Sequence, residues 1–149
     1  MEWSNDLIGR CSAPKTHHIH RGALEQFARA LELHYLPYFD PEAAKSAGFR
    51  DVIAPPTFAI TLTANEIPGL ELPGAGIIHG EQQFSYHEPI TAGDEIQVVQ
   101  CIEKLKARGA AVFLTLKTTG RNTQGDEVFV SRSLLIVNLD SVSHKESAQ

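Results

Sequence analysis

A change in hydrophobic periodicity near the middle of the chain constrains the fold more than any other feature of the sequence. Before a Gly- and Pro-rich stretch at residues 68–76, apolar residues recur at helical spacing, and after it they alternate as in strands. Four strand-like runs follow, at residues 77–87, 95–106, 110–118 and 127–137. Helices followed by consecutive strands favour an antiparallel sheet packed against a helix over a parallel βαβ arrangement. We therefore predict an α+β fold.

The sequence of the first half of the chain predicts two helices, joined by a long loop that contains a short helical turn. Apolar residues recur at i, i+3, i+4 and i+7 from Leu24, which predicts a helix over about residues 21–33. A short helical turn is expected to begin at Pro41 and to close at Gly48. After two prolines, residues 57–66 have the composition of a buried helix.

Size, composition and charge are those of one globular domain. The chain has 149 residues, of which 42% are hydrophobic and 21% are charged, so a packed core is expected. A formal net charge of -5 supplies no basic field for phosphates and argues against nucleic-acid binding. No apolar run is long enough to span a membrane, and the first residues lack a signal-peptide pattern, so we expect a cytoplasmic protein.

The two cysteines, Cys11 and Cys101, lie far apart in sequence and have no metal-ligand spacing. The simplest interpretation is that both are reduced thiols, with Cys101 in a strand. Three histidines, His17, His18 and His20, fall in a stretch that can form a short strand over residues 15–20. Only His18 and His20 would share a face and no third ligand is close, so surface histidines are expected rather than a metal site.

The first long strand is the most informative for function. Simple alternation would place one polar set on one face and a more apolar set on the other. The first set is His79, Glu81, Gln83, Ser85 and His87, and the second is Ile78, Gln82, Phe84 and Tyr86. A polar face of a strand is usually exposed to solvent or lies in a subunit interface. The alternative interpretation is that His79 or His87 has a functional role.

The sequence lacks the motifs of serine hydrolases, nucleotide-binding proteins and thiol enzymes. It contains no Gly-x-Ser-x-Gly elbow, no Gly-rich phosphate loop and no paired Cys and His nucleophile. Hydration of a double bond beside a thioester would need a carboxylate and a histidine that share one water, together with backbone N–H donors for the enolate oxygen.

Three motifs, in this order, resemble the N-terminal MaoC-like dehydratase domains. They are FDPEAAKSAG at residues 39–48, VIAPPTF at residues 52–58 and HGEQQFSYHEPITAGD at residues 79–94. The likeness extends from about the first helix to Val137. It implies a hotdog fold, in which a curved antiparallel sheet wraps around a central helix, here residues 57–66. We expect the hotdog domain to span residues 1–138 and residues 139–149 to form a flexible tail.

The motif of active MaoC-type (R)-specific hydratases is not matched. Those enzymes carry Asp-x-Asn-Pro-Leu-His before the Asp-Pro turn, and its Asp and His form the catalytic dyad. Aligned on Asp40 and Pro41 without a gap, Leu33 falls on the Asp and Tyr38 on the His, although a one-residue gap would bring in His34. Where active members place His-Gly before the central helix, this chain has Ala54 followed by Pro55, which has no N–H to donate.

The resemblance therefore implies an accessory, substrate-binding subunit of a (3R)-hydroxyacyl thioester dehydratase or enoyl-CoA hydratase. Its ligand would be an acyl-CoA or an acyl-carrier-protein thioester, and neither a cofactor nor a metal is expected. Its partner would be a catalytic MaoC-type subunit, or a second copy of the chain, because an exposed sheet edge favours pairing. The residues expected to bind the substrate are Tyr38, Pro55, Thr57, Phe58, His79 and Tyr86, and the catalytic candidates are His34, Tyr38 and His79.

Two alternatives remain open at this point. The first is a self-sufficient homo-oligomeric hydratase or thioesterase that pairs His34, His79 or His87 with Glu32 or Glu81. The second is a ligand-binding or regulatory hotdog protein that shows no turnover with any partner.

Overall fold

A computed structural model describes residues 3–138 and contains one five-stranded antiparallel sheet with strand order β1-β3-β4-β5-β2. The strands are β1 (Lys15–His18), β2 (Ile77–Tyr86), β3 (Glu95–Arg108), β4 (Ala111–Arg121) and β5 (Glu127–Asn138). Every predicted strand is present, and the α+β class and the hotdog-type sheet are confirmed. The strand order leaves β2 at one edge of the sheet and the short β1 at the other.

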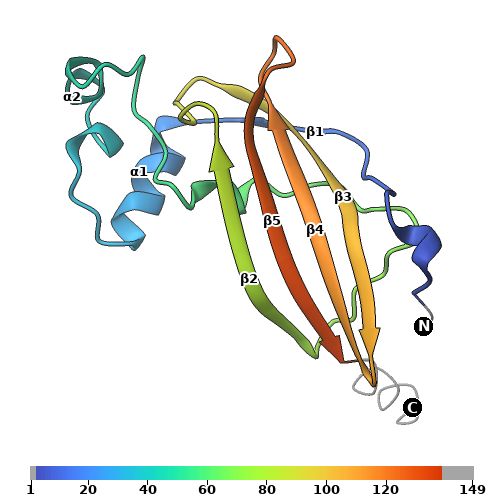
Figure 1. The fold of residues 1–149 in the computed structure, drawn as a ribbon. Helices are drawn as coiled ribbons and strands as arrows, with labels where there is room; N and C mark the ends of the chain where they lie inside the picture. The colour runs from blue at the N-terminus through green and yellow to red at the C-terminus, as the bar shows by residue number, and fades with distance from the viewer. Residues whose placement is uncertain (1–2, 139–149) are drawn as a thin grey trace.

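The two α-helices, α1 (Arg21–Ala30) and α2 (Pro41–Ser46), lie at one end of the sheet, beside β2 (Figure 1). Three single 3-10 turns also form: η1 (Asn5–Leu7), η2 (Leu36–Tyr38) and η3 (Phe58–Thr61). Of these, η1 lies on the other side of the sheet, near the N-terminus and β3. The Asp40 side chain caps α2 by accepting a hydrogen bond of 3.1 Å from the Glu42 backbone N–H. Pro41 occupies the first turn of α2, and Gly48 ends the segment with φ at 94°, as the sequence predicted.

The prediction of a central helix over residues 57–66 is wrong, because only the 3-10 turn η3 forms there. The chain leaves helical geometry at Leu62, which has ψ of 77°, and then runs extended beneath the sheet. Several β-branched residues weaken helix formation in this segment. Pro68 also pushes Ile67 out of the helical region, and Ile67 is instead buried in the core.

The core consists of two clusters of buried side chains. The larger cluster joins α1 and η3 to the sheet, with Leu24, Phe58 and Phe129 among its members. The smaller cluster packs Leu7 and Ile67 against strands β3 and β4. Leu24 is fully buried, and a leucine side chain contributes roughly 1.5–3 kcal/mol when it is removed from water. The helical end is therefore anchored to the sheet by apolar packing.

The prediction of two reduced thiols is wrong, because Cys11 and Cys101 form a disulfide. Cys101 does lie in a strand, β3, as expected. The N-terminal segment runs beside β3 and brings the two residues opposite each other, although 90 positions separate them in sequence. This proximity depends on tertiary pairing, which cysteine spacing alone does not reveal.

A β-bulge in β2 changes the alternation that the sequence suggested. The register with β5 shifts between His79 and Glu81, so His79 moves to the face that carries Gln82. The predicted polar face therefore loses His79 and gains Ile78, whose side chain is 63% exposed.

No helix among residues 3–138 is long and apolar enough to cross a bilayer. The tail predicted at residues 139–149 lies outside the described residues.

Candidate functional site

An apolar pocket of about 290 Å³ lies where the end of β2 meets the loop that precedes η3. It is lined by Tyr38, Phe49, Ile53, Ala54, Pro55, Pro56, Tyr86, Glu88, Pro89 and Ile90. Three of the predicted substrate-binding residues, Tyr38, Pro55 and Tyr86, therefore meet in one pocket, although they come from three separate segments. An apolar pocket with a few polar groups is typical of sites for small organic ligands.

Two tyrosines, Tyr38 and Tyr86, bring hydroxyl groups to this pocket. Burial raises the pKa of Tyr86 to about 12, and its hydroxyl donates a hydrogen bond to the Pro56 carbonyl oxygen. Burial, and then the neighbouring Tyr35, raise the pKa of Tyr38. Both phenols therefore remain protonated near neutral pH and can act as hydrogen-bond donors, but not as bases.

The backbone donors beside the pocket are used by the fold itself. The Ile53 N–H donates to the Pro37 carbonyl at 3.1 Å, and the Ala54 N–H donates to the Ile90 carbonyl at 2.7 Å. The next two residues, Pro55 and Pro56, have no N–H. The residues that would precede a central helix therefore offer no free donor to a thioester carbonyl.

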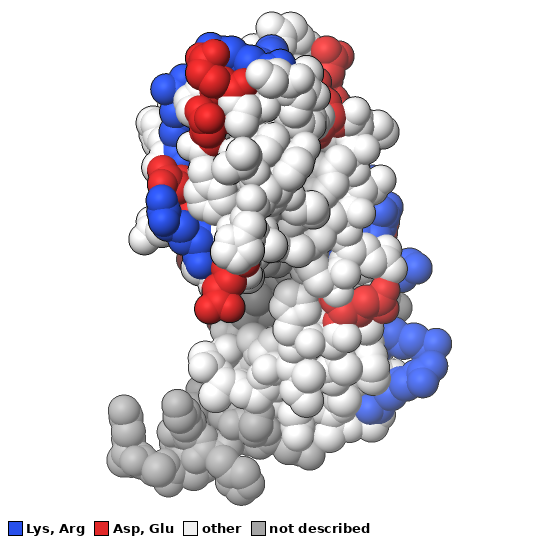
Figure 2. Space-filling model, turned by 90° about the vertical axis from the view of Figure 1, so that its left-hand side faces the viewer, with Lys and Arg blue, Asp and Glu red and all other residues white. Residues whose placement is uncertain are grey.

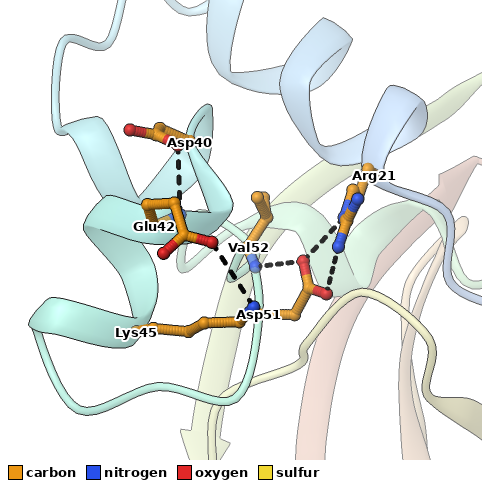
Figure 3. A network of polar contacts seen from close by, with 6 residues as sticks. All are labelled: Arg21, Asp40, Glu42, Lys45, Asp51 and Val52. Atoms are coloured by element: carbon orange, nitrogen blue, oxygen red, sulfur yellow. Dashed lines mark hydrogen bonds and ion pairs between the residues drawn. The ribbon is translucent and has the colours of Figure 1, made fainter.

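A polar network fixes the loop that carries Ile53 and Ala54 (Figure 3). The Arg21 guanidinium of α1 makes two hydrogen bonds, of 2.8 and 2.7 Å, to the Asp51 carboxylate. The same carboxylate accepts a hydrogen bond of 2.7 Å from the Val52 N–H. The network thus ties the start of α1 to the pocket wall.

The pH dependence of stability tests this network. Hydrogen bonds from Arg21 lower the pKa of Asp51 to about 2 in the folded protein, against about 3.9 in an unfolded chain. The lowered pKa means that the stabilisation is complete above about pH 4 and is lost as the pH falls towards 2. In thermal unfolding, the Tm difference between wild type and Asp51→Asn should therefore shrink over this range. Glu42→Gln, which changes an exposed carboxylate of α2, is the control. A Tm difference for Asp51→Asn that is independent of pH would contradict the assignment.

The other predicted site residues lie elsewhere. Thr57 is exposed and directly follows the pocket wall, whereas Phe58 is only 5% exposed and belongs to the core, where it makes an edge contact with Phe27. His79 lies towards the opposite end of β2, and its Nε2 is 3.0 Å from Gln82 Oε1. Ser133 also donates to that Gln82 oxygen, at 2.5 Å. The structure therefore does not bring His79 to the pocket.

His34 lines a second, wider pocket of about 610 Å³ at the end of α1. Its other lining residues are Arg29, Glu32, Leu33, Leu36 and Phe39. The proposed pairing of His34 with Glu32 is thus compatible with the structure, because both side chains line this pocket. His87 instead pairs with Glu127, at 3.2 Å. Among residues 3–138, no group of three or more His, Cys, Asp or Glu side chains is placed to hold a metal ion.

Charged side chains leave much of this end of the molecule uncovered. Figure 2 looks onto the β2 edge and the helices, and the acidic and basic residues gather mainly near the top and the margins of that face. Uncharged residues occupy most of the area between them, which is compatible with contacts to an apolar ligand or to another protein surface.

Comparisons with known proteins identify the group of proteins to which the chain is related. Residues 6–131 match the model of the FAS1-like, dehydratase domain region. A UPF0336 protein of Saccharopolyspora erythraea is 36% identical over 143 residues, which cover 91% of this chain and 92% of the relative. This chain belongs to the FAS1-like dehydratase domain family. The predicted resemblance to MaoC-like dehydratase domains is thereby confirmed.

Solved structures agree with this family membership at the level of the fold. The HadBC (3R-hydroxyacyl-ACP dehydratase) complex of Mycobacterium tuberculosis contains a chain with a TM-score of 0.76 and 24% identity. The match covers 89% of our chain and 98% of that chain. A MaoC-like dehydratase also matches with a TM-score of 0.76, at 19% identity; it covers 89% of our chain but 42% of the other.

The FAS1-like dehydratase domain thus carries a pocket that sequence reasoning found only in part. Glu88 and Pro89 were not singled out, although both lie within the third motif, at residues 79–94. Glu88 is the one carboxylate among the described residues that line the pocket, and it accepts a hydrogen bond of 3.4 Å from Asn122. The sequence feature that could have indicated Glu88 as a pocket residue is its position directly after Tyr86 and His87 in that motif.

Proposed function

We propose that this chain is the accessory, substrate-binding subunit of a (3R)-hydroxyacyl thioester dehydratase or enoyl-CoA hydratase. The observation that carries the proposal is the composition of the apolar pocket. Its described lining includes Tyr38, Tyr86 and Glu88, but neither a histidine nor an aspartate. A pocket of this kind can hold an acyl group, whereas hydration chemistry requires an acid/base pair and a free oxyanion donor.

Two further features support a paired assembly. A MaoC-like dehydratase of similar fold is more than twice as long as the part that our chain matches, and the HadBC chain comes from a complex. In addition, β2 forms an edge of the sheet and is ten residues long, so it offers an unpaired ladder to a partner strand. We infer that a catalytic hotdog subunit pairs with this chain and contributes the Asp and His.

The substrate of the proposed pair is an acyl thioester carried by CoA or by an acyl carrier protein. In our proposal the acyl group contacts the apolar wall at Ile53, Ala54 and Ile90, and the Tyr38 hydroxyl donates a hydrogen bond near the thioester end. No cofactor is needed for this role, because addition or removal of water is acid/base chemistry.

Hydration of crotonyl-CoA and of a longer enoyl-CoA, followed by the loss of enoyl absorbance, tests the proposal. The chain should be assayed alone and after co-expression with a neighbouring gene that encodes an Asp-x-Asn-Pro-Leu-His motif. An acid/base pair contributes about 10²–10⁴-fold to rates, so we expect turnover to rise by about 10³-fold with the partner. Robust turnover by the chain alone would overturn the proposal and direct attention to His34 and Glu32.

A variant of this chain separates a substrate-binding role from simple support of the partner. Ala54→Phe fills the pocket and should raise KM for the longer enoyl-CoA more than for crotonyl-CoA, whereas Ala47→Phe changes an exposed residue outside the pocket. Equal effects of the two substitutions on both substrates would show that this chain supports the partner without binding the acyl group.

A further inference from the structure

The N-terminal segment forms an arm, defined here as residues 3–14, that extends the β1 edge of the sheet along β3. Cys11 lies opposite Cys101 in an antiparallel bridge, and the two are joined by a disulfide. Four hydrogen bonds flank this bridge: Gly9 N–H to Ile102 O at 2.8 Å, Ile102 N–H to Arg10 O at 3.0 Å, Ser12 N–H to Gln100 O at 2.8 Å and Gln100 N–H to Ser12 Oγ at 3.0 Å. The disulfide is therefore the covalent part of a clasp that holds the arm to the sheet.

The surroundings of the disulfide favour thiol chemistry. Cys11 is exposed to solvent, so an external thiol can reach its sulfur. On the other side, Cys101 pairs in register with Lys117 of β4, and directly paired residues project from the same face of a sheet. A nearby cation stabilises a thiolate and makes it a better leaving group. Glu103 interacts electrostatically with Lys117, but its carboxylate accepts a hydrogen bond of 2.9 Å from Arg132.

The arm, in turn, holds the extended segment that follows η3. Asn65 Nδ2 donates to the carbonyls of Ala13 and Pro14, at 3.2 and 3.0 Å. In β1, directly after the arm, Lys15 Nζ donates to Thr63 Oγ1 at 3.1 Å. Leu7 of the arm is buried in the same cluster as Ile67. Loss of the clasp should therefore loosen the segment at residues 62–67 as well as the arm.

We propose that Cys11–Cys101 is a thiol–disulfide exchange site that is reduced in the folded protein by a dithiol reductant. One thiolate of the reductant attacks the exposed Cys11 sulfur and displaces the Cys101 thiolate, which Lys117 stabilises. The second thiol of the reductant then releases Cys11, which leaves two cysteine thiols and one oxidised reductant. Two electrons pass from the dithiol to the protein disulfide.

Reduction removes the covalent tie but leaves the four flanking hydrogen bonds, so the arm becomes less protected while the sheet remains folded. Arms and termini are where local opening requires the least free energy. Because the segment at residues 62–67 continues from η3 and the pocket wall, loosening of this segment on reduction should also make the wall of the acyl pocket more mobile. This last consequence rests on the proposed function, whereas the exchange itself does not.

The first test measures the rate of reduction of the full chain by dithiothreitol, with free thiols trapped and counted by mass. The rate should rise linearly with dithiothreitol and should exceed the rate of global unfolding, read from hydrogen exchange in β4 and β5. Lys117→Gln removes the cation beside the leaving thiolate and should slow exchange about threefold. Lys106→Gln, on the same face of β3 but further along the strand, is the matched control and should leave the rate unchanged.

The second test compares hydrogen exchange of the oxidised and reduced chains, and of the Cys11→Ser/Cys101→Ser variant. Amides of residues 3–14 and 62–67 should exchange at least tenfold faster in the reduced chain and in the variant, with β4 and β5 unchanged. Reduction no faster than global unfolding, or unchanged protection of the arm, would overturn the proposal. Neither readout uses enzyme activity, so failure here leaves the proposed function standing, and a partner assay without turnover leaves this inference standing.

Discussion

Gly120→Val should strongly destabilise the protein, because it places a branched side chain where the core has no room for one. Gly120 lies in β4 opposite Phe129 of β5, and both are buried. A Cβ atom at position 120 would overlap the Phe129 ring, with its Cδ1 at 2.6 Å. Phe129 is fully buried and contacts the Tyr86 ring beside the pocket, so it has no free space into which to move. Overpacking of this kind costs about 3 kcal/mol or more, which lowers Tm by roughly 10 °C.

Thermal and urea unfolding of four variants, Gly120→Val, Gly120→Ala, Gly120→Ala/Phe129→Leu and Gly22→Ala, would isolate the cause. Gly22→Ala is the matched control, because nothing lies within 4 Å of a Cβ at that position of α1, and the change should stabilise the protein by about 0.5–1 kcal/mol. Phe129→Leu introduced into Gly120→Ala should recover part of the loss, since the smaller side chain removes the overlap. A Gly120→Val protein as stable as wild type would show that the sheet can shift to accept the side chain.

The sequence predicted the sheet well because its strands are half-buried. In β4, residues 111–120 alternate strictly between partly buried and buried positions, and that pattern can be read directly from residue type. The fold class followed from these strands and from the order of the three motifs. Helix α1 was also predicted, because its apolar stripe packs against the sheet.

The errors share one physical origin, which is that tertiary contacts override local pattern. Phe58, Ala59 and Leu62 could be buried by either a helix or an extended segment, so composition could not distinguish the two. The Cys11–Cys101 disulfide was not predicted, because the two residues meet only when the N-terminal arm lies beside β3. His79 was misplaced because one bulge reverses the faces of a strand.

The candidate site was predicted in part for the same reason. Tyr38, Pro55 and Tyr86 were selected from motif positions, and the fold brings these three segments together. Glu88 and Ile90 follow β2 in a loop without periodicity, so pattern reasoning gave them no weight. His79 was predicted from its position in a motif, but it lies near the N-terminal end of β2, whereas the pocket is at the C-terminal end of that strand.

The second large effect concerns the proposed association with a partner through β2, which Gln82→Pro should weaken about 100-fold. The His87 N–H donates to the Val128 carbonyl at 2.8 Å, which fixes the alternation of hydrogen-bonded pairs between β2 and β5. The backbone groups of Ser85 and Gln83 therefore point to β5, and those of Tyr86, Phe84 and Gln82 point to the free edge. Proline at position 82 removes an edge donor without breaking a β5 hydrogen bond, at a cost of about 3 kcal/mol to a partner ladder.

Gln82→Ala is the matched control, because it keeps the backbone N–H and loses only side-chain hydrogen bonds, those with His79, Ser133 and the Gln83 carbonyl. Association can be measured by sedimentation velocity of the chain with its co-expressed partner, after circular dichroism and Tm have shown that each variant is folded. We expect Gln82→Ala to assemble and Gln82→Pro not to assemble at micromolar concentration. Equal assembly of both variants would place the partner elsewhere, with the exposed helical end around Tyr35 and Leu36 as the next surface to test. Loss of assembly together with loss of hydration would connect the sheet edge to the shared acyl site, since the two subunits would then need a continuous sheet to align the pocket with the acid/base pair.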